Sequence, residues 1–250
     1  MLNEKKIVVV MPAFNAGRTL EVTYGEIPFE IVDEVIVVDD LSSDNTVAIA
    51  KSLRIEHIIV HDNNKGYGGN QKSCYKKALE LEADIIIMLH PDYQYTPKLI
   101  PAIANLLATG LYQVVLGSRI LGKGALNGGM PKHKYIANRL LTFFQNICLN
   151  QKLSEYHTGY RAFTREVLTA INFSANSDDF LFDNQLLCQV FSAGYEIAEI
   201  TCPTKYFPDA SSINLRKSVV YGLGVIKTSM QYTLHKKKLA HFNIFESTET

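Results

Sequence analysis

The feature that most constrains the fold is a continuous apolar run at residues 85–89, which ends abruptly at His90-Pro91-Asp92. Such a run without polar alternation is typical of a strand buried on both faces of a parallel sheet. Pro91 cannot donate a ladder hydrogen bond and holds His90 extended, so the strand ends there. Ligands of open parallel sheets bind just beyond the carboxyl ends of strands. Asp92 is therefore a candidate for handling a metal or a phosphate, and capping of a helix near Pro97 is the structural alternative.

Apolar runs of strand length alternate with helical segments along the first half of the chain. We expect strands at residues 6–11, 32–38, 57–61, 85–89 and 113–117, and helices at 16–24, 46–53, 71–81 and 97–109. Residues 63–70 are rich in glycine and are expected to form a turn before the third helix. This alternation indicates βα units and a mainly parallel α/β sheet flanked by helices.

The second half of the chain is less regular. We expect a glycine-rich loop at residues 122–129 that could close over a ligand, helices at 134–149, 164–171 and 184–193, and strands at 158–163 and 196–203. From Ser218 onwards, apolar residues fall on one helical face and three lysines follow at 236–238. We therefore expect a domain at residues 1–217 and an amphipathic helical tail at 218–250.

The tail has two interpretations. It could lie on an anionic membrane surface, or it could dock on the domain or form a homo-oligomer contact. Gly222 and Gly224 weaken a helix and Lys227 interrupts its apolar face, which favours docking or self-association.

Charge and cysteine usage exclude several classes of protein. Lys and Arg together number 25, as do Asp and Glu, so the balance offers no footprint for nucleic acid. The four cysteines are widely spaced, which indicates buried thiols in a reducing compartment rather than a disulfide frame or a zinc site. We find no signal peptide and no apolar span long enough to cross a membrane. The expected location is cytoplasmic, with peripheral contact at the inner face of the membrane left open.

Polar side chains follow three of the expected strands: Asn15, Asp39 with Asp40, and His90 with Asp92. The carboxyl ends of parallel strands meet at one edge, so these groups converge on a crevice. A carboxylate can read a base or ribose, and another can hold Mg²⁺ or Mn²⁺ on a diphosphate. Basic residues that could clamp phosphate oxygens are Arg119, Lys132, Lys134 and Arg161. A nucleoside diphosphate carrying a transferable group fits these residues.

Six motifs occur in order along the chain. They are Met11-Pro-Ala-Phe-Asn15, Val37-Val-Asp-Asp-Leu-Ser-Ser-Asp-Asn-Thr46, Asn64-Lys-Gly-Tyr-Gly68, His90-Pro-Asp-Tyr-Gln94, Gly117-Ser-Arg119 and Thr158-Gly-Tyr-Arg-Ala-Phe163. Over about residues 5–217 the chain resembles the family 2 glycosyltransferases of GT-A fold, in particular the branch of dolichyl- and polyprenyl-phosphate sugar synthases.

The resemblance implies roles for individual residues. Asp92 matches the metal-ligating last acid of the family's Asp-x-Asp, while His90 replaces its first acid. An imidazole ligates Mn²⁺ but suits Mg²⁺ poorly. The resemblance places Pro12, Phe14 and Asn15 on the nucleoside and Asp40, beside Asp39, on the base. It places Gln94 after the metal-binding acid, and Arg119 and Lys134 near the diphosphate and an acceptor phosphate.

The family inverts configuration at the sugar by direct displacement. A hydroxyl acceptor needs a general base, whereas a phosphate ionised at pH 7 needs none. Asp183 and Glu155 are the candidate bases, each with a structural role as the alternative, and Asp179 is expected to cap a helix.

These observations together favour an inverting, metal-dependent glycosyltransferase that uses a nucleoside-diphosphate sugar and either a polyprenyl phosphate or a glycan as acceptor. A sugar-nucleotide-binding module with lapsed catalysis is the non-enzymatic alternative, since His90 replaces an acid. A sugar nucleotidyltransferase is disfavoured because no glycine-rich, basic loop follows the first strand.

Overall fold

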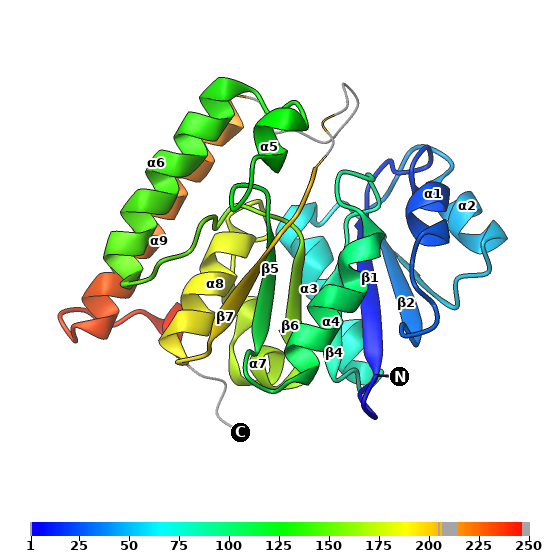
Figure 1. Cartoon of the computed structure of the whole chain (residues 1–250), viewed down its shortest axis with the longest axis horizontal. Coiled ribbons are helices and arrows are strands. Elements are labelled where there is room, and N and C mark those ends of the chain that lie inside the picture. The colour runs from blue at the N-terminus through cyan, green and yellow to red at the C-terminus, as the bar shows by residue number, and fades with distance from the viewer. Residues whose placement is uncertain (1, 205, 207–214, 247–250) are drawn as a thin grey trace.

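The protein folds around one seven-stranded sheet (Figure 1), which a computed structural model describes for residues 2–204, 206 and 215–246. The strands are β1 (Ile7–Ala13), β2 (Glu34–Asp39), β3 (His57–Val60), β4 (Ile85–Met88), β5 (Val114–Ser118), β6 (Arg161–Thr164) and β7 (Ile197–Thr201). Their order is β3-β2-β1-β4-β6-β5-β7. Within the described residues, only β6 runs antiparallel to its neighbours β4 and β5. The expected mainly parallel α/β sheet is confirmed.

Helices cover both faces of the sheet because its strands are apolar on both sides. Alternate residues of β1 enter different cores: Val8 and Val10 pack with α3 (Gly66–Glu80), α7 (Arg165–Ala170) and α8 (Phe182–Ser192). Val9 and Met11 pack on the other face with α1 (Leu20–Gly25), α2 (Thr46–Ser52) and α4 (Ile100–Ala108). This two-sided burial is the physical basis of the continuous apolar runs.

Two glycine-rich segments differ from expectation. Helix α3 begins at Gly66, inside the stretch expected to form a turn. A Cβ at Gly66 or Gly68 would lie 2.6 Å or 2.4 Å from a backbone carbonyl oxygen of residues 177–178, so the glycines allow two distant segments to touch. The expected loop at residues 122–129 contains a short helix, α5 (Gly124–Asn127).

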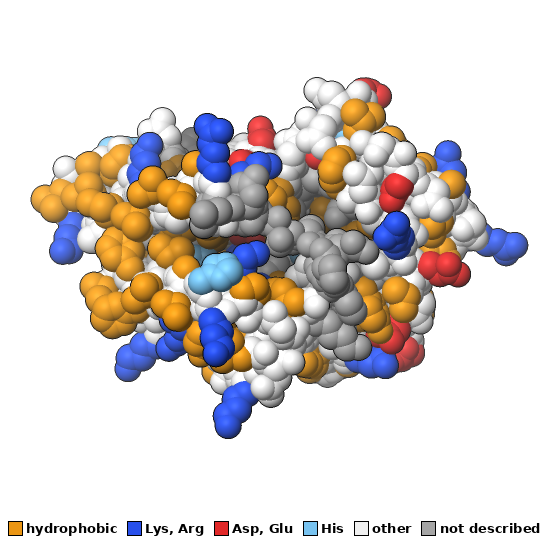
Figure 2. All heavy atoms as spheres, turned by 90° about the horizontal axis from the view of Figure 1, so that it is seen from above, with side chains coloured by type: hydrophobic (Ala, Val, Ile, Leu, Met, Phe, Trp, Pro, Cys, Tyr) orange, Lys and Arg blue, Asp and Glu red, His pale blue; other side chains and the backbone are white. Residues whose placement is uncertain are grey.

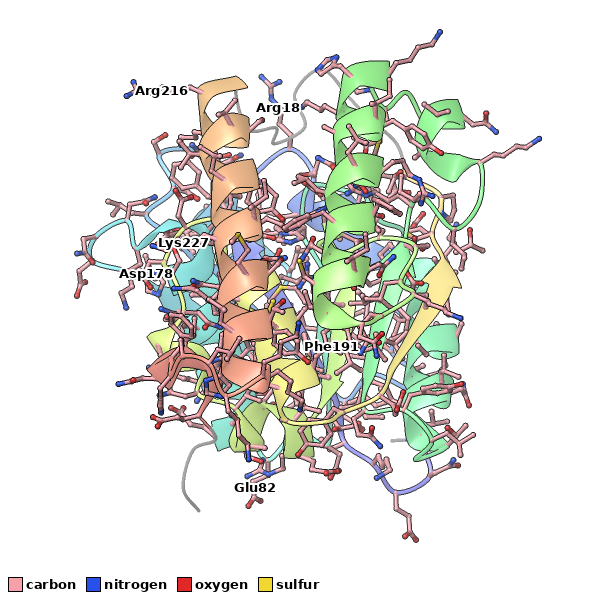
Figure 3. All side chains as sticks on the ribbon, turned by 90° about the vertical axis from the view of Figure 1, so that its left-hand side faces the viewer. Arg18, Glu82, Asp178, Phe191, Arg216 and Lys227 are labelled. Carbon is pink, nitrogen blue, oxygen red and sulfur yellow. The ribbon has the colours of Figure 1, made fainter. Side chains whose placement is uncertain are left out.

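A long pair of helices closes one end of the sheet. Helix α9 (Leu215–Lys236) lies beside α6 (Lys132–Leu149) and also packs on α8 (Figures 1 and 3). The glycines expected to weaken α9 sit at these contacts: a Cβ at Gly222 would be 3.9 Å from Leu141 Cδ1, and one at Gly224 would be 3.0 Å from Leu181. The domain boundary at residue 217 stays a prediction, because residues 207–214 before it and 247–250 at the end of the tail lie outside the described part.

All four cysteines are free thiols; Cys74, Cys188 and Cys202 are buried as expected, while Cys148 is half-buried. None of the described helices combines the length and the apolar character that crossing a membrane requires.

Candidate active site

A cavity of about 290 Å³ lies beyond the carboxyl end of β4, between the sheet and the α6–α9 pair. The predicted site residues that line it are His90, Asp92, Gln94, Arg119, Lys134 and Asp183. Seven others lie outside its described lining: Pro12, Phe14, Asn15, Asp39, Asp40, Glu155 and Arg161. The cavity therefore joins most of the residues expected around the metal, the diphosphate and the acceptor, Glu155 and Arg161 excepted, and the five residues expected around the nucleoside lie outside its described lining.

A tight turn after β4 presents Asp92. Its Oδ1 accepts a hydrogen bond from the backbone N–H of Gln94 at 3.1 Å, the local geometry that Asp favours in turns. Tyr93, between them, has a left-handed φ of 56° and donates its hydroxyl hydrogen to Glu26 at 2.8 Å. The turn thereby brings both Asp92 and Gln94 to the cavity wall.

His90 is held by a hydrogen-bond chain that sequence reasoning did not anticipate. Tyr67, at the start of α3, donates its hydroxyl hydrogen to Asp183 at 2.8 Å and lies 3.2 Å from His90 Nε2. Because that hydrogen is used on Asp183, the Tyr67 oxygen accepts from His90 Nε2–H. Burial and the Asp183 charge raise the pKa of Tyr67 well above its usual value, so the phenol stays protonated. Only a glycine fits beside this ring, since a Cβ at Gly159 would be 2.7 Å from His90 Nε2.

Arg161 lies beneath the cavity rather than in its wall. The side chain is fully buried, and its guanidinium donates to the carbonyls of Thr158 at 2.6 Å, Asp183 at 2.7 Å and Tyr156 at 2.9 Å. Its Nη2 also lies 3.7 Å from Asp183 Oδ2. The structure thus directs Arg161 toward Asp183 and the backbone, not toward a phosphate in the cavity as expected.

Glu155 is fully buried and faces Arg119. Its carboxylate accepts from the Arg119 backbone N–H at 2.8 Å and from Nε at 2.9 Å, and from Asn138 at 2.7 Å. Burial alone would raise the pKa of Glu155, but the charge and hydrogen bonds of Arg119 hold it below its usual value. Glu155 therefore orients the guanidinium of Arg119, which lines the cavity. The Glu155 carboxylate itself is not part of the described lining.

The two acids at the carboxyl end of β2 are also engaged in hydrogen bonds. Asp40 is buried, and its carboxylate accepts from the backbone N–H groups of Lys65 at 2.8 Å and Gly66 at 2.9 Å while lying 2.7 Å from His61 Nδ1. Asp39 accepts from the backbone N–H of Ser42 at 2.9 Å. Both acids fix the loops at the sheet edge.

The loop after β1 leaves one aromatic ring exposed. Asn15, with a left-handed φ of 52°, donates its backbone N–H to Ser42 at 2.8 Å and accepts from Ser43 N–H at 2.8 Å. Phe14 is 55% exposed. The β1 and β2 loops are thus joined by hydrogen bonds into one platform at the same sheet edge as the cavity, with the Phe14 ring exposed on it.

Sequence reasoning missed the pair His157 and Tyr221, both of which line the cavity. His157 Nδ1 lies 2.8 Å from the Tyr221 hydroxyl of α9, and its buried Nε2 has no hydrogen-bond partner among the described residues. Burial, together with the nearby Arg119 and Arg161, lowers the pKa of His157 to about 4, although Glu155 opposes the shift. The ring is therefore neutral at pH 7. His157 directly precedes the Thr158 motif, and this position could have pointed to it. Nothing in the sequence predicts its contact with Tyr221.

The side chains at this site suit a metal ion that is coordinated mainly by the bound substrate. Within the described residues no cluster of three or more His, Cys, Asp or Glu side chains could enclose a metal. Mg²⁺ commonly binds through one or two carboxylates together with substrate phosphates and water. Asp92 supplies one such carboxylate, and His90, which lines the same cavity, suits Mn²⁺ better than Mg²⁺.

Comparison with known proteins places this geometry in a family. A sequence model described as Glycosyl transferase family 2 matches residues 8–171. An uncharacterized protein of Methanocaldococcus jannaschii is 30% identical over 207 residues, covering 82% of this chain and 84% of that protein. The UDP-N-acetylglucosamine–dolichyl-phosphate N-acetylglucosaminyltransferase of Methanococcus voltae is 26% identical over 219 residues, covering 81% of this chain and 87% of that enzyme.

The fold is shared with glucosyl-3-phosphoglycerate synthase from Mycobacterium tuberculosis. Its structure in complex with Mn²⁺ and UDP-glucose superposes with a TM-score of 0.70 and 21% identity, covering 92% of this chain and 79% of that one. This likeness confirms the expected GT-A architecture. Because the family model spans most of the sheet and the start of the second half, the chain belongs to glycosyl transferase family 2 and is a glycosyltransferase.

Proposed function

We propose that the protein transfers a sugar, with inversion, from a UDP-sugar to the phosphate of a polyprenyl phosphate, and that the reaction requires Mg²⁺ or Mn²⁺. The observation that carries this proposal is the meeting of Asp92, Arg119 and Lys134 in one cavity. A relative with a dolichyl-phosphate acceptor and a fold neighbour in complex with Mn²⁺ and UDP-glucose support it.

The donor occupies the sheet edge in this proposal. The exposed Phe14 ring and the Pro12 to Asn15 loop contact the nucleoside, and Asp39 and Asp40 support that contact by fixing the neighbouring loops. The diphosphate points toward Asp92 and Gln94, which the turn after β4 holds in place. Asp92, with His90 in the same cavity, would hold the cation. When bound, the cation neutralises the charge that develops on the leaving diphosphate.

The acceptor occupies the side of the cavity formed by α6 and α9. Arg119 and Lys134 bind its phosphate, and Glu155 keeps the Arg119 guanidinium charged and oriented. Three apolar residues, Met130, Ala137 and Leu141, line the same side and suit the first units of a prenyl chain.

A phosphate acceptor also fits the state of Asp183. Its two carboxylate oxygens already accept from Tyr67 at 2.8 Å and Gln71 at 3.1 Å, and Arg161 lies close by. Both carboxylate oxygens are thus engaged by neighbouring side chains. An acceptor that is ionised at pH 7 needs no base, so Asp183 acts through Tyr67 on His90. Transfer to a glycan hydroxyl, with Asp183 as base, is the second candidate.

The test combines donor binding with transfer. The protein is incubated with radiolabelled UDP-glucose or UDP-N-acetylglucosamine and Mn²⁺ or Mg²⁺, with a short polyprenyl phosphate in detergent or a soluble oligosaccharide as acceptor. We expect cation-dependent label in the organic phase with the polyprenyl phosphate. Label only on the oligosaccharide would establish the glycan candidate instead. A cation-dependent rise in melting temperature with UDP-sugars, but no transfer to either acceptor, would indicate a binding module.

A further inference from the structure

Helices α6 and α9 present apolar side chains to the outside of the molecule. On α6 these are Ile136, Leu140, Phe143 and Ile147, which are 57% to 66% exposed; on α9 they are Val219, Val220, Leu223 and Met230, which are 53% to 64% exposed. We call these eight residues the α6–α9 face. Figure 2 shows hydrophobic side chains gathered at the left-hand end of the molecule, where Figure 1 places the two helices.

The polarity of α6 is the reverse of that of a helix facing water. Its exposed apolar residues recur at helical spacing along one side. Its inward side carries Asn138, Thr142 and Gln145, which are buried. Helix α9 buries Thr228 and Ser229 together with Val225 and Tyr232, and it exposes Leu223 and Met230. A helix that hides polar groups and exposes apolar ones is suited to an apolar environment on its outer side.

The charged side chains carried by α6 and α9 are all basic. Residues 132–149 and 215–241 contain no Asp or Glu. Their basic residues are Lys132, Lys134, Arg139, Arg216, Lys217, Lys227, Lys236, Lys237 and Lys238. An isologous contact with a second copy would set cations against cations, whereas anionic lipid headgroups complement them.

We propose that the α6–α9 face lies on the surface of an anionic lipid bilayer, with its apolar side chains at the level of the headgroup and acyl boundary. Because the described helices lack a membrane-spanning segment, the contact is one of surface docking. The same helices line the cavity through Lys134, Leu141 and Tyr221. A lipid phosphate at the bilayer surface would thus meet the cavity without its chain crossing water. This last step depends on the proposed acceptor; the docking itself does not.

The experiment is flotation of the full chain with vesicles, without donor or cation. One set contains phosphatidylglycerol mixed with phosphatidylcholine, and the other contains phosphatidylcholine alone. We expect binding to the anionic vesicles that weakens with salt, and at least about tenfold weaker binding to the neutral ones. No flotation with anionic vesicles, or equal flotation with both sets, would overturn the proposal.

A matched pair of variants locates the contact. Phe143→Glu combined with Leu223→Glu places two carboxylates on the face and should reduce vesicle binding at least about tenfold. Leu111→Glu makes the same kind of change at a residue that is 71% exposed outside the face, and should leave binding unchanged. Melting temperatures check that both variants are folded, and Lys227→Glu tests the charge contribution without altering an apolar residue. A wild-type dimer in solution that the double variant dissociates would show that a second copy covers the face, and would also overturn the proposal.

Transfer in detergent separates this inference from the proposed function. The double variant should transfer sugar to a short, detergent-dispersed polyprenyl phosphate as the wild type does, because its changes lie outside the cavity lining. Vesicle binding without transfer would refute the proposed acceptor and leave the docking surface in place. Transfer without vesicle binding would refute the docking surface alone.

Discussion

The loops after β1 and β2 differ from the α6–α9 pair in how their polar groups are satisfied and in which side chains they expose. In the loops, polar side chains such as Asn15 and Asp40 accept hydrogen bonds from backbone N–H groups, so these side chains are satisfied within the chain. In the helix pair, polar residues such as Asn138 are buried, and apolar residues such as Phe143 face outward. The difference teaches that the loops are organised by contacts within the chain, whereas the helix pair exposes apolar side chains that the proposed bilayer contact would cover. Asp92 lies between the two.

The largest effect should follow from a substitution of Asp92, which lies between the two regions. Asp92→Ala removes the carboxylate proposed to hold the cation, so kcat/KM for transfer should fall about 10³-fold, on the order of 4 kcal/mol. Radiolabel transfer measures the loss, and an unchanged melting temperature shows that the fold is intact. Asp62→Ala, which removes an exposed acid after β3, should be silent. Retained full activity of Asp92→Ala would refute the proposed site.

A loss of comparable size, in stability rather than in activity, should follow from a change beneath the α6–α9 side of the cavity. Glu155→Gln leaves the Arg119 guanidinium partly buried and without its counter-charge, which should lower the free energy of unfolding by about 3 to 5 kcal/mol. Urea denaturation measures this, with the exposed Glu56→Gln as the control. A change below about 0.5 kcal/mol would mean that Glu155 is not the anchor of Arg119.

The third prediction concerns acid sensitivity on the α9 side of the cavity. The pKa of His157 is lowered from 6.5 to about 4, so the unfolded chain binds a proton below pH 6.5 that the folded protein does not. This group should therefore make stability fall as the pH drops from 6.5 toward 4, by up to about 3 kcal/mol.

His157→Gln should remove that part of the pH dependence. The free energy of unfolding of both proteins at pH 7, 5.5 and 4.5 gives the difference, which cancels the contribution of other groups such as Glu155. Parallel pH profiles of the wild type and the variant would show that the imidazole is not held neutral by burial.

The smallest effect should come from the donor platform. Phe14→Ala removes an exposed ring, so the fold should not be weakened, while the KM for the UDP-sugar should rise by about fivefold, or about 1 kcal/mol. Phe143→Ala, the matching change on the α6–α9 face, should leave that KM unaltered. Equal effects of the two substitutions on this KM would mean that the two regions do not differ in their contribution to donor binding.

Much of the fold follows from local pattern. The apolar runs that became β1, β2, β4 and β5 were predictable because strands buried on both faces have no polar alternation. Asp92 was predictable as a cavity residue because Pro91 ends β4 at the sheet edge. The start of α3 at Gly66 was not predictable, because those glycines are required by the backbone of residues 177–178, which approach only in the folded protein.

The roles of charged residues divide in the same way. Sequence alone determined which acids and bases stand at strand ends and which helical positions of α9 are apolar, since periodicity and turn residues act over a few positions. Only the tertiary structure decided that Arg161 and Glu155 are buried against partners, while Arg119 and Lys134 line the cavity. It also decided that His157 meets Tyr221 and that the inward side of α6 is the polar one. The physical reason is that burial and hydrogen-bond partners arise from contacts between segments far apart in the chain, which no local pattern records.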